Sequence, residues 1–269
     1  MENIRIGFIG AGNMGGALAS AVCKATDAQN VMLADKSREK AFELAKKLCC
    51  SFSDNTSVVS SCDFIFLGVK PQMMGDMLAE IAPVLKARNN DFVLITMAAG
   101  MKIEKITALL GFDCPVIRIM PNTAVEVGEG MVLYAVNEKV NEDAENAFLA
   151  FMSNAGKLDK IPETLIDAGS AVSGCGPAFV YMFIEALADG GVKCGLPRST
   201  ALKYAEQTLI GAAKLAMETG RHPEELKDAV CSPAGSTIEG CFALEKGSFR
   251  AATVDAVSAA FERTKELGK

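Results

Sequence analysis

Three glycines near the amino end of the chain have the spacing of a phosphate-binding turn. They follow an apolar run at residues 4–9 directly and precede a helical pattern that begins near residue 13. In this setting the first glycine permits a tight turn, the second lets a pyrophosphate approach the backbone, and the third lets helix and strand pack closely. The segment therefore predicts a dinucleotide site, with a purely structural turn as the alternative. Its residues are Gly10, Ala11, Gly12, Asn13, Met14 and Gly15.

A polar segment after the second predicted strand bears on the choice of dinucleotide. Asp35 lies 20 residues after Gly15, where an acid commonly binds the adenosine ribose of NAD. Ser37 and Arg38 suit a ribose 2′-phosphate instead, because a hydroxyl and a guanidinium donate hydrogen bonds to phosphate. Together with Lys36 they favour NADPH, and Asp35 leaves NADH as the alternative. Lys36 and Arg38 are also compatible with ordinary solvated charges at a helix start.

Two more segments close predicted strands at their carboxyl ends, the edge at which open α/β sheets bind ligands. Small residues in the second segment would let a nicotinamide ring lie against the backbone. Each segment alone could be an ordinary turn, but their shared position predicts that both border the dinucleotide. They are Val69, Lys70 and Pro71 after one strand, and Met97, Ala98 and Ala99 after the next.

A loop rich in hydroxyl groups precedes a helical pattern in the second half of the chain. Ser232, Gly235, Ser236 and Thr237 lie in this loop. The free N–H groups of a helix start and the nearby hydroxyls together form an anion site, which predicts that the loop binds an acidic group of a substrate. The alternative is that Ser236 or Thr237 only caps the helix. We interpret His222, ahead of Pro223, as a helix-entry residue and not as a catalyst.

Composition excludes several other kinds of chemistry. The chain has 269 residues, a net charge of −6, nine cysteines and one histidine. It lacks CxxC and GxSxG motifs, so we expect neither a metal centre nor a Ser-His-Asp triad. The acidic balance argues against a nucleic-acid surface. The cysteines, among them Cys23, Cys62, Cys175 and Cys194, are expected to be reduced, small buried residues.

The sequence also bears on where in the cell the protein is located. No apolar run is expected to reach the length of a membrane span, and the first predicted strand begins too soon after Met1 for a signal peptide. We therefore expect a cytoplasmic protein without a membrane segment.

Short apolar runs alternate with amphipathic stretches up to about residue 160. This alternation predicts right-handed βαβ units and a doubly wound, mostly parallel sheet covered on both faces, the Rossmann arrangement. From about Pro162 onward only helical patterns follow, so we predict a dinucleotide-binding domain at 1–161 and a helical domain at 162–269. The predicted strands cover residues 4–9, 31–34, about 50–52, 64–69, 92–96, 116–120 and 130–135.

One helix of the second half, Ala178 to Asp189, is apolar on every side and is expected to end at Gly190 and Gly191. Such a helix must be buried within its own domain or against another subunit. The sequence therefore predicts a homodimer or a higher oligomer.

Several segments are similar to motifs of pyrroline-5-carboxylate reductases. The resemblance spans nearly the whole chain in order, from FIGAGNMG at 8–15 through VKPQ at 69–72. The most specific matches are SGCGPAF at 173–179, DGGVKCGLPR at 189–198, QTLIGAAK at 207–214 and HPEELKDAVCSPAGSTI at 222–238.

The resemblance implies hydride transfer from NAD(P)H to the C=N bond of 1-pyrroline-5-carboxylate, which gives L-proline. It implies that Thr237, with Ser232, Gly235 and Ser236, contacts this substrate, and that Glu163 is a weaker candidate. It further implies that Asn55 contacts the dinucleotide, and that the helical domain dimerises. A protonated cyclic imine is already electrophilic, so the protein mainly has to position it against the nicotinamide. We assign its carboxylate to the loop and expect the Thr237 hydroxyl near its nitrogen, as a hydrogen-bond partner or as a proton donor through water.

The chain departs from the family pattern at Ala234, where a glycine is usual, at Cys231 and at Cys175. If residue 234 has a positive φ, alanine adds strain of about 1 kcal/mol. Other enzymes of the same plan remain alternatives, namely a reductase of a different cyclic imine or a 3-hydroxyacid dehydrogenase. A dinucleotide-sensing protein without turnover would have no use for the hydroxyl-bearing loop.

Overall fold

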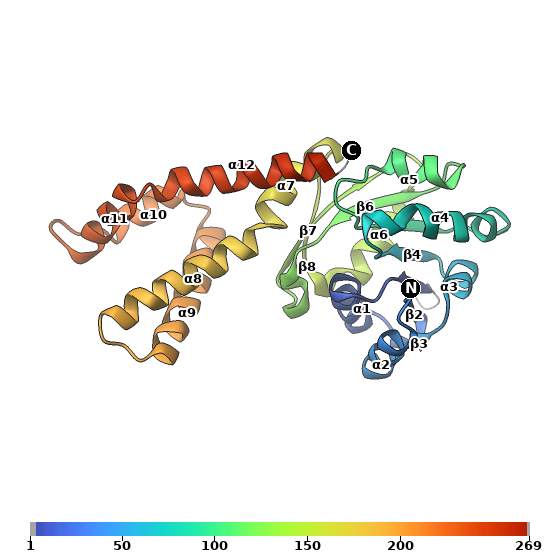
Figure 1. Ribbon diagram of the computed structural model, residues 1–269, viewed down its shortest axis with the longest axis horizontal. Helices are drawn as coiled ribbons and strands as arrows, with labels where there is room; N and C mark the ends of the chain where they lie inside the picture. The colour runs from blue at the N-terminus through green and yellow to red at the C-terminus, as the bar shows by residue number, and fades with distance from the viewer. Residues whose placement is uncertain (1–3, 268–269) are drawn as a thin grey trace. The chain divides into compact units, whose positions relative to one another are not determined.

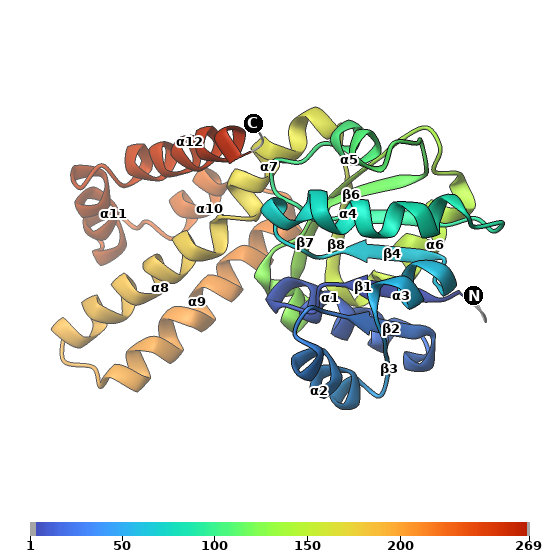
Figure 2. The ribbon, with the colours of Figure 1, turned by 45° about the vertical axis from the view of Figure 1, so that its right-hand side comes forward.

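The computed structural model describes residues 4–267 (Figures 1 and 2). Residues 1–3 and 268–269 lie outside the described residues. They include the first residues on which the expectation of no signal peptide rests, and the outer ends of both predicted domains. Contacts divide the chain into two compact units. The first holds residues up to Cys175 together with those from Ala260 onward, and the second holds Gly176–Ala259.

The first unit is built on an eight-stranded sheet in the order β3-β2-β1-β4-β5-β6-β7-β8. Neighbouring strands are parallel except β6 and β7, so β7 and β8 run opposite to the other six. The strands are β1 (Ile6–Ile9), β2 (Val31–Ala34), β3 (Ser51–Phe52), β4 (Phe64–Leu67), β5 (Val93–Thr96), β6 (Val116–Met120), β7 (Gly130–Val136) and β8 (Gly156–Lys160). The chain reverses its order between β1 and β4, and that reversal puts a crevice at the carboxyl ends of these strands.

Helices cover both faces of this sheet, and each face has its own apolar core. Phe8 and Phe66 stack in one core, with ring centroids 4.2 Å apart, beneath α1, α2 and α6. Met74 and Leu78 lie in the other core with α3 and α5. The helices are α1 (Asn13–Ala25), α2 (Arg38–Leu48), α3 (Asn55–Ser61), α4 (Pro71–Lys86), α5 (Ile103–Leu110) and α6 (Glu142–Phe151). The predicted doubly wound, mostly parallel sheet is confirmed.

The described part of the chain from Ile166 to Leu267 is helical. Its helices are α7 (Ile166–Ser173), α8 (Gly176–Lys193), α9 (Arg198–Thr219), α10 (Pro223–Ala229), α11 (Ser236–Lys246) and α12 (Phe249–Leu267). The long helices α8 and α9 lie side by side, as both views show.

The contacts divide the chain at residues 175 and 176, later than the predicted boundary at 161 and 162. The reason is α7, which packs on the sheet. Ile166 is fully buried in a cluster with Met120 and Leu133, and the Asn122 amide donates a hydrogen bond of 3.0 Å to the carbonyl of Ser173. The change of sequence pattern thus marks where helices begin, whereas the compact unit ends one helix later.

The second unit has almost no core of its own. Among its described residues the buried hydrophobic side chains are Ala188, Ala201 and Ala205. Larger apolar side chains are exposed instead, including Met182 at 70% and Phe242 at 69%. The apolar helix α8 is therefore not buried within its own chain, which leaves burial against another subunit as the remaining part of the prediction.

The stretch Glu163–Lys193 corrects one expectation. Its 31 residues are long and apolar enough to cross a membrane by length and composition alone, with a mean hydropathy of 1.4 and 11% of the apolar window buried. The sequence pattern does not reveal this stretch because charged residues, Asp167 and Glu185 among them, interrupt the apolar run. A single such stretch is weak evidence for a membrane span, since a helix that packs against another subunit has the same composition.

Smaller differences from the sequence analysis have local causes. The strand β8 was not predicted, because its sequence GKLDK is polar and it lies at the edge of the sheet. The helix α8 continues through Gly190 and Gly191 to Lys193. The cysteines are all free as predicted, but of the four named above only Cys62 is buried, and Cys194 is exposed.

Candidate dinucleotide pocket and anion loop

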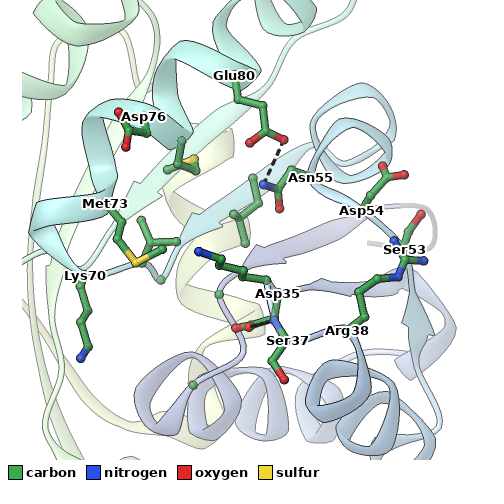
Figure 3. Close-up of a pocket in the computed structure, with 17 residues that line it drawn as sticks. Asp35, Ser37, Arg38, Ser53, Asp54, Asn55, Lys70, Met73, Asp76 and Glu80 are labelled. Carbon is green, nitrogen blue, oxygen red and sulfur yellow. Dashed lines mark hydrogen bonds between the residues drawn. The ribbon is translucent and has the colours of Figure 1, made fainter.

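A pocket of about 830 Å³ lies at the carboxyl ends of β1, β2 and β4, where the strand order reverses (Figure 3). Its volume falls within the range of small-molecule sites, roughly 300–1,000 Å³. Of the residues predicted to contact a dinucleotide, it is lined by Gly10, Gly12, Asp35, Lys36, Ser37, Arg38, Asn55, Val69 and Lys70.

The three glycines of the turn differ in what they do. Gly10 has φ 102°, and a Cβ there would lie 2.6 Å from the carbonyl of Gly68, so both the backbone conformation and the neighbouring strand require glycine. A Cβ on Gly15 would overlap the carbonyl oxygen of Gly10. A Cβ on Gly12 would meet no protein atom within 4 Å. Packing within the protein therefore explains why positions 10 and 15 are glycine. Gly12 instead keeps the pocket side of the turn open, which the close approach of a pyrophosphate would require.

Asp35 joins the two loops that border the pocket. One carboxylate oxygen accepts a 2.8 Å hydrogen bond from the backbone N–H of Ala11, and the other accepts one of 2.8 Å from the N–H of Ser37. Both oxygens are thus engaged by the backbone. Asp35 fixes the glycine turn against the start of α2, a structural role beyond the ribose contact predicted for it.

Ser37 and Arg38 begin α2 at the rim of the same pocket. The Ser37 side chain makes no cap hydrogen bond. The guanidinium carbon of Arg38 lies 5.2 Å from the centroid of the Phe52 ring. Hydrogen bonds from the N–H and hydroxyl of Ser57 lower the carboxyl pKa of Asp54, and the charge of Arg38 lowers it further. The hydroxyl of Ser37 and the guanidinium of Arg38 therefore keep donors available to a ligand.

The far side of the pocket was largely missed from sequence. One face of α4 lines it with Met73, Asp76, Met77 and Glu80, whose spacing of three and four residues is the repeat of a helix face. The Asn55 amide donates a hydrogen bond of 3.3 Å to Glu80 from the start of α3 (Figure 3). The remaining lining residues that were not predicted are Ile9, Ser53, Asp54 and Gly68, each at or just beyond a strand end.

Other residues expected at the dinucleotide do not line this pocket. Ala11, Asn13, Met14 and Gly15 form the turn and the first residues of α1 behind it, and Pro71 is the first residue of α4. Met97, Ala98 and Ala99 follow β5, whose last residue Thr96 pairs with Leu67 of β4. They therefore stand one strand further along the same sheet edge.

The predicted anion loop lies in the second unit between α10 and α11. Its helix begins with Gly235 as the N-cap, and neither Ser236 nor Thr237 caps it. The N–H of Gly235 donates a 3.0 Å hydrogen bond to the carbonyl of Ser232. A Cβ on Gly235 would overlap the Ser232 hydroxyl and lie 3.0 Å from the Ser232 carbonyl oxygen, so a larger residue there would have to displace the Ser232 side chain. The interpretation of Ser236 or Thr237 as a plain cap is therefore wrong, and the unpaired N–H groups of the first turn accompany hydroxyls that are not used as caps.

His222 has the role predicted for it, because its Nδ1 accepts a 3.2 Å hydrogen bond from the N–H of Glu224 at the start of α10. Ala234 has φ 53°, the left-handed conformation for which the family pattern supplies glycine.

Glu163, the weaker substrate candidate, lies in the first unit and is engaged there. One of its carboxylate oxygens accepts a 2.7 Å hydrogen bond from the N–H of Ile103 at the start of α5 and lies 3.4 Å from the guanidinium of Arg118. Arg118 is fully buried and also pairs with Asp167 at 2.6 Å. This arrangement gives Glu163 a structural role, because it compensates a buried charge and supports a helix start.

Comparison with known proteins gives the family of this chain. Residues 163–267 match the family model described as pyrroline-5-carboxylate reductase dimerisation, and residues 5–100 match the model described as NADP oxidoreductase, coenzyme F420-dependent. The pyrroline-5-carboxylate reductase of Methanosarcina acetivorans is 41% identical over all of both chains. The chain belongs to the pyrroline-5-carboxylate reductase family.

Solved structures agree with this membership. A Plasmodium falciparum pyrroline carboxylate reductase with NADP bound superposes with a TM-score of 0.90 at 34% identity, covering all of both chains. The pyrroline-5-carboxylate reductase of Coxiella burnetii superposes with a TM-score of 0.89 at 30% identity, covering 99% of both chains. For this member of the reductase family, the fold and the order of its two parts are therefore those of its relatives.

Proposed function

We propose that the protein reduces 1-pyrroline-5-carboxylate to L-proline with NADPH. A hydride passes from the nicotinamide ring to the imine carbon, the C=N double bond becomes a single bond, and the nitrogen takes up one proton that water supplies. NADPH leaves as NADP⁺. One observation carries the proposal. A chain similar to these reductases over its full length has both an open pocket at the glycine turn and a helix start that bears hydroxyl groups.

NADPH is the preferred coenzyme, and NADH is accepted less well. Both oxygens of Asp35 already accept backbone hydrogen bonds, so this residue has fewer acceptor sites left for a ribose 2′-hydroxyl. Ser37 and Arg38 supply donors suited to a 2′-phosphate. The Plasmodium relative, which was solved with NADP bound, supports the same preference.

The anion loop binds the substrate. Backbone N–H groups at the start of α11, with the hydroxyls of Ser232 and Ser236 and the turn at Gly235, bind the carboxylate. The Thr237 hydroxyl donates a hydrogen bond to the ring nitrogen or passes it a proton through water. Glu163 stabilises the start of α5 and the buried Arg118 in the first unit, and it contributes to substrate binding only through that structural role.

The protein acts as a homodimer or as a higher oligomer built from dimers. The exposed apolar side chains of α8, α11 and α12, and the match of residues 163–267 to a dimerisation family, support this assembly. An apolar groove of about 390 Å³, lined by Phe179, Met182 and Phe249 among others, is part of the same surface. We propose a cytoplasmic location on sequence grounds alone.

The test is a steady-state assay of both dinucleotides with 1-pyrroline-5-carboxylate, a six-membered cyclic imine and a 3-hydroxyacid. We expect NADPH oxidation with the five-membered imine to have the highest kcat/KM. Faster turnover of another substrate would overturn the assignment.

Thr237→Ala tests the proposed role of the hydroxyl. We expect kcat/KM for the imine to fall roughly five- to 150-fold, equivalent to about 1–3 kcal/mol of transition-state stabilisation, with KM for NADPH nearly unchanged. Thr237→Ser keeps the hydroxyl and is the matched control, so it should retain most activity. Unchanged turnover in Thr237→Ala would remove this residue from the mechanism.

A further inference from the structure

The aromatic ring of Phe52 lies outside the residues that line the dinucleotide pocket, yet it contacts one that does. The guanidinium carbon of Arg38 stands 5.2 Å from the ring centroid, within the range of a cation–π contact. Figure 3 shows Arg38 extending from the start of α2 toward Ser53 and Asp54. These two residues follow Phe52 directly in the chain, so the ring and the pocket wall share one short segment.

Arg38 has few other restraints. Its side chain is exposed, and among residues 4–267 its interactions are the Phe52 ring and the more distant charge of Asp54. A long exposed arginine loses much rotamer freedom when it binds a ligand, so a contact that limits its rotamers beforehand strengthens binding. The ring supplies such a contact and leaves the N–H donors of the guanidinium free, because a ring face accepts none of them strongly.

Phe52 is itself held from two sides. It is the last residue of β3 and pairs with Leu33 of β2, and the N–H of Ser53 continues this pairing with a 2.9 Å hydrogen bond to the carbonyl of Leu33. The Phe42 ring of α2 packs edge-on against it, with ring centroids 6.0 Å apart and an angle of 80° between the ring planes. The ring is therefore anchored to the sheet, while the arginine it contacts is anchored only at its backbone.

We infer that Phe52 is a positioning residue for coenzyme choice, which holds the Arg38 guanidinium where it meets the 2′-phosphate of NADPH. Asp54 takes part by keeping its carboxylate in place. It caps α3 through a 2.8 Å hydrogen bond from the N–H of Ser57, so its negative charge attracts Arg38 from one side without forming an ion pair that would occupy the donors. The inference rests on the proposed preference for NADPH.

The test measures KM for NADPH and for NADH in Phe52→Leu. We expect KM for NADPH to rise about two- to fivefold, the range of an exposed cation–π contact, while KM for NADH stays within error. Phe52→Tyr keeps the ring and should restore the wild-type value. Phe42→Leu removes the neighbouring ring, which packs on Phe52 and has no cation–π contact with Arg38 in the described part of the chain, and should move KM for NADPH less than Phe52→Leu does.

The same substitution in an Arg38→Ala background separates positioning from plain structural support. If Phe52 acts through Arg38, Phe52→Leu should change KM for NADPH no further in that background. Equal changes for both dinucleotides, or an undiminished change without Arg38, would overturn the inference while leaving the proposed function intact. A wild-type protein that does not oxidise NADPH with the imine would instead refute the proposed function.

Discussion

The two units of this chain bury their apolar side chains in opposite ways. The sheet unit encloses two cores of its own, in which Phe8, Phe66 and Leu78 have no measurable exposure. The helical unit buries three alanines and exposes Met182, Phe242 and many other large apolar side chains. Since burial of apolar area is the main favourable term in folding, the first unit contains its own source of stability and the second depends on a further surface.

The dinucleotide pocket and the anion loop differ in a parallel way. The pocket walls are set by β-strand pairing and by glycines at which a Cβ would overlap backbone atoms of the same unit. The anion loop leaves its hydroxyls out of the helix cap, and no packing contact of this kind accounts for them. The comparison therefore separates residues required by packing from residues required by a ligand or a second copy.

The largest effect should come from Gly15→Ala. Its added methyl group would overlap the carbonyl oxygen of Gly10, a backbone atom that cannot move without opening the turn. We expect a loss of about 1–3 kcal/mol or more in the free energy of unfolding, measured by urea denaturation.

Gly12→Ala is the matched control, because its Cβ meets no protein atom within 4 Å. We expect unchanged stability and weaker NADPH binding, measured by fluorescence titration. If Gly12→Ala proved as destabilising as Gly15→Ala, the division between packing glycines and a ligand glycine would fail.

An effect of similar size, on assembly instead of folding, is expected from Met182→Glu on the apolar groove of the helical unit. A carboxylate buried without a partner at a subunit interface costs several kcal/mol, so we expect the dimer dissociation constant to rise roughly hundredfold or more. Sedimentation equilibrium measures it directly. Val127→Glu places the same charge on the sheet unit, at a side chain that is 76% exposed compared with 70% for Met182, and should leave the dimer intact. Similar constants for the two variants would contradict the contrast between the units.

The smallest effect should come from Ala234→Gly in the anion loop. Alanine at φ 53° is strained by about 1 kcal/mol, which glycine relieves. We expect the melting temperature to rise by a few degrees or less and KM for the imine to fall slightly, with kcat retained. A lower melting temperature together with a raised KM would show that the loop benefits from the methyl group.

Periodicity was enough to predict most of the fold. The buried runs at 31–34 and 116–120 became strands with the same bounds, and the glycine turn fell between β1 and α1 as expected. The edge strand β8 was missed because alternating polar residues at a sheet edge carry little apolar signal. The compact unit extends one helix beyond the predicted boundary, because α7 packs on β7 through side chains whose partners lie far away in sequence.

The site was predicted less completely than the fold. Residues adjacent to strand ends, such as Lys70, could be placed from motifs. The lining residues from Met73 to Glu80 could not, because the sequence does not show which face of α4 is directed to the pocket. The conformation at Ala234 followed from the glycine it replaces. No pattern could have indicated that the Glu163 carboxylate supports α5 and pairs with Arg118, since that depends on three segments meeting in space.

The Asp35 carboxylate has a practical consequence for altering the coenzyme. Replacing the residue at this position is an obvious route to changing selectivity between NADPH and NADH, yet here the side chain ties the N–H of Ala11 to that of Ser37. Its removal would release the phosphate turn and the start of α2 at once, and both coenzymes would lose their shared binding surface. Redesign should therefore begin at Ser37 and Arg38 and preserve the aspartate that links the two loops.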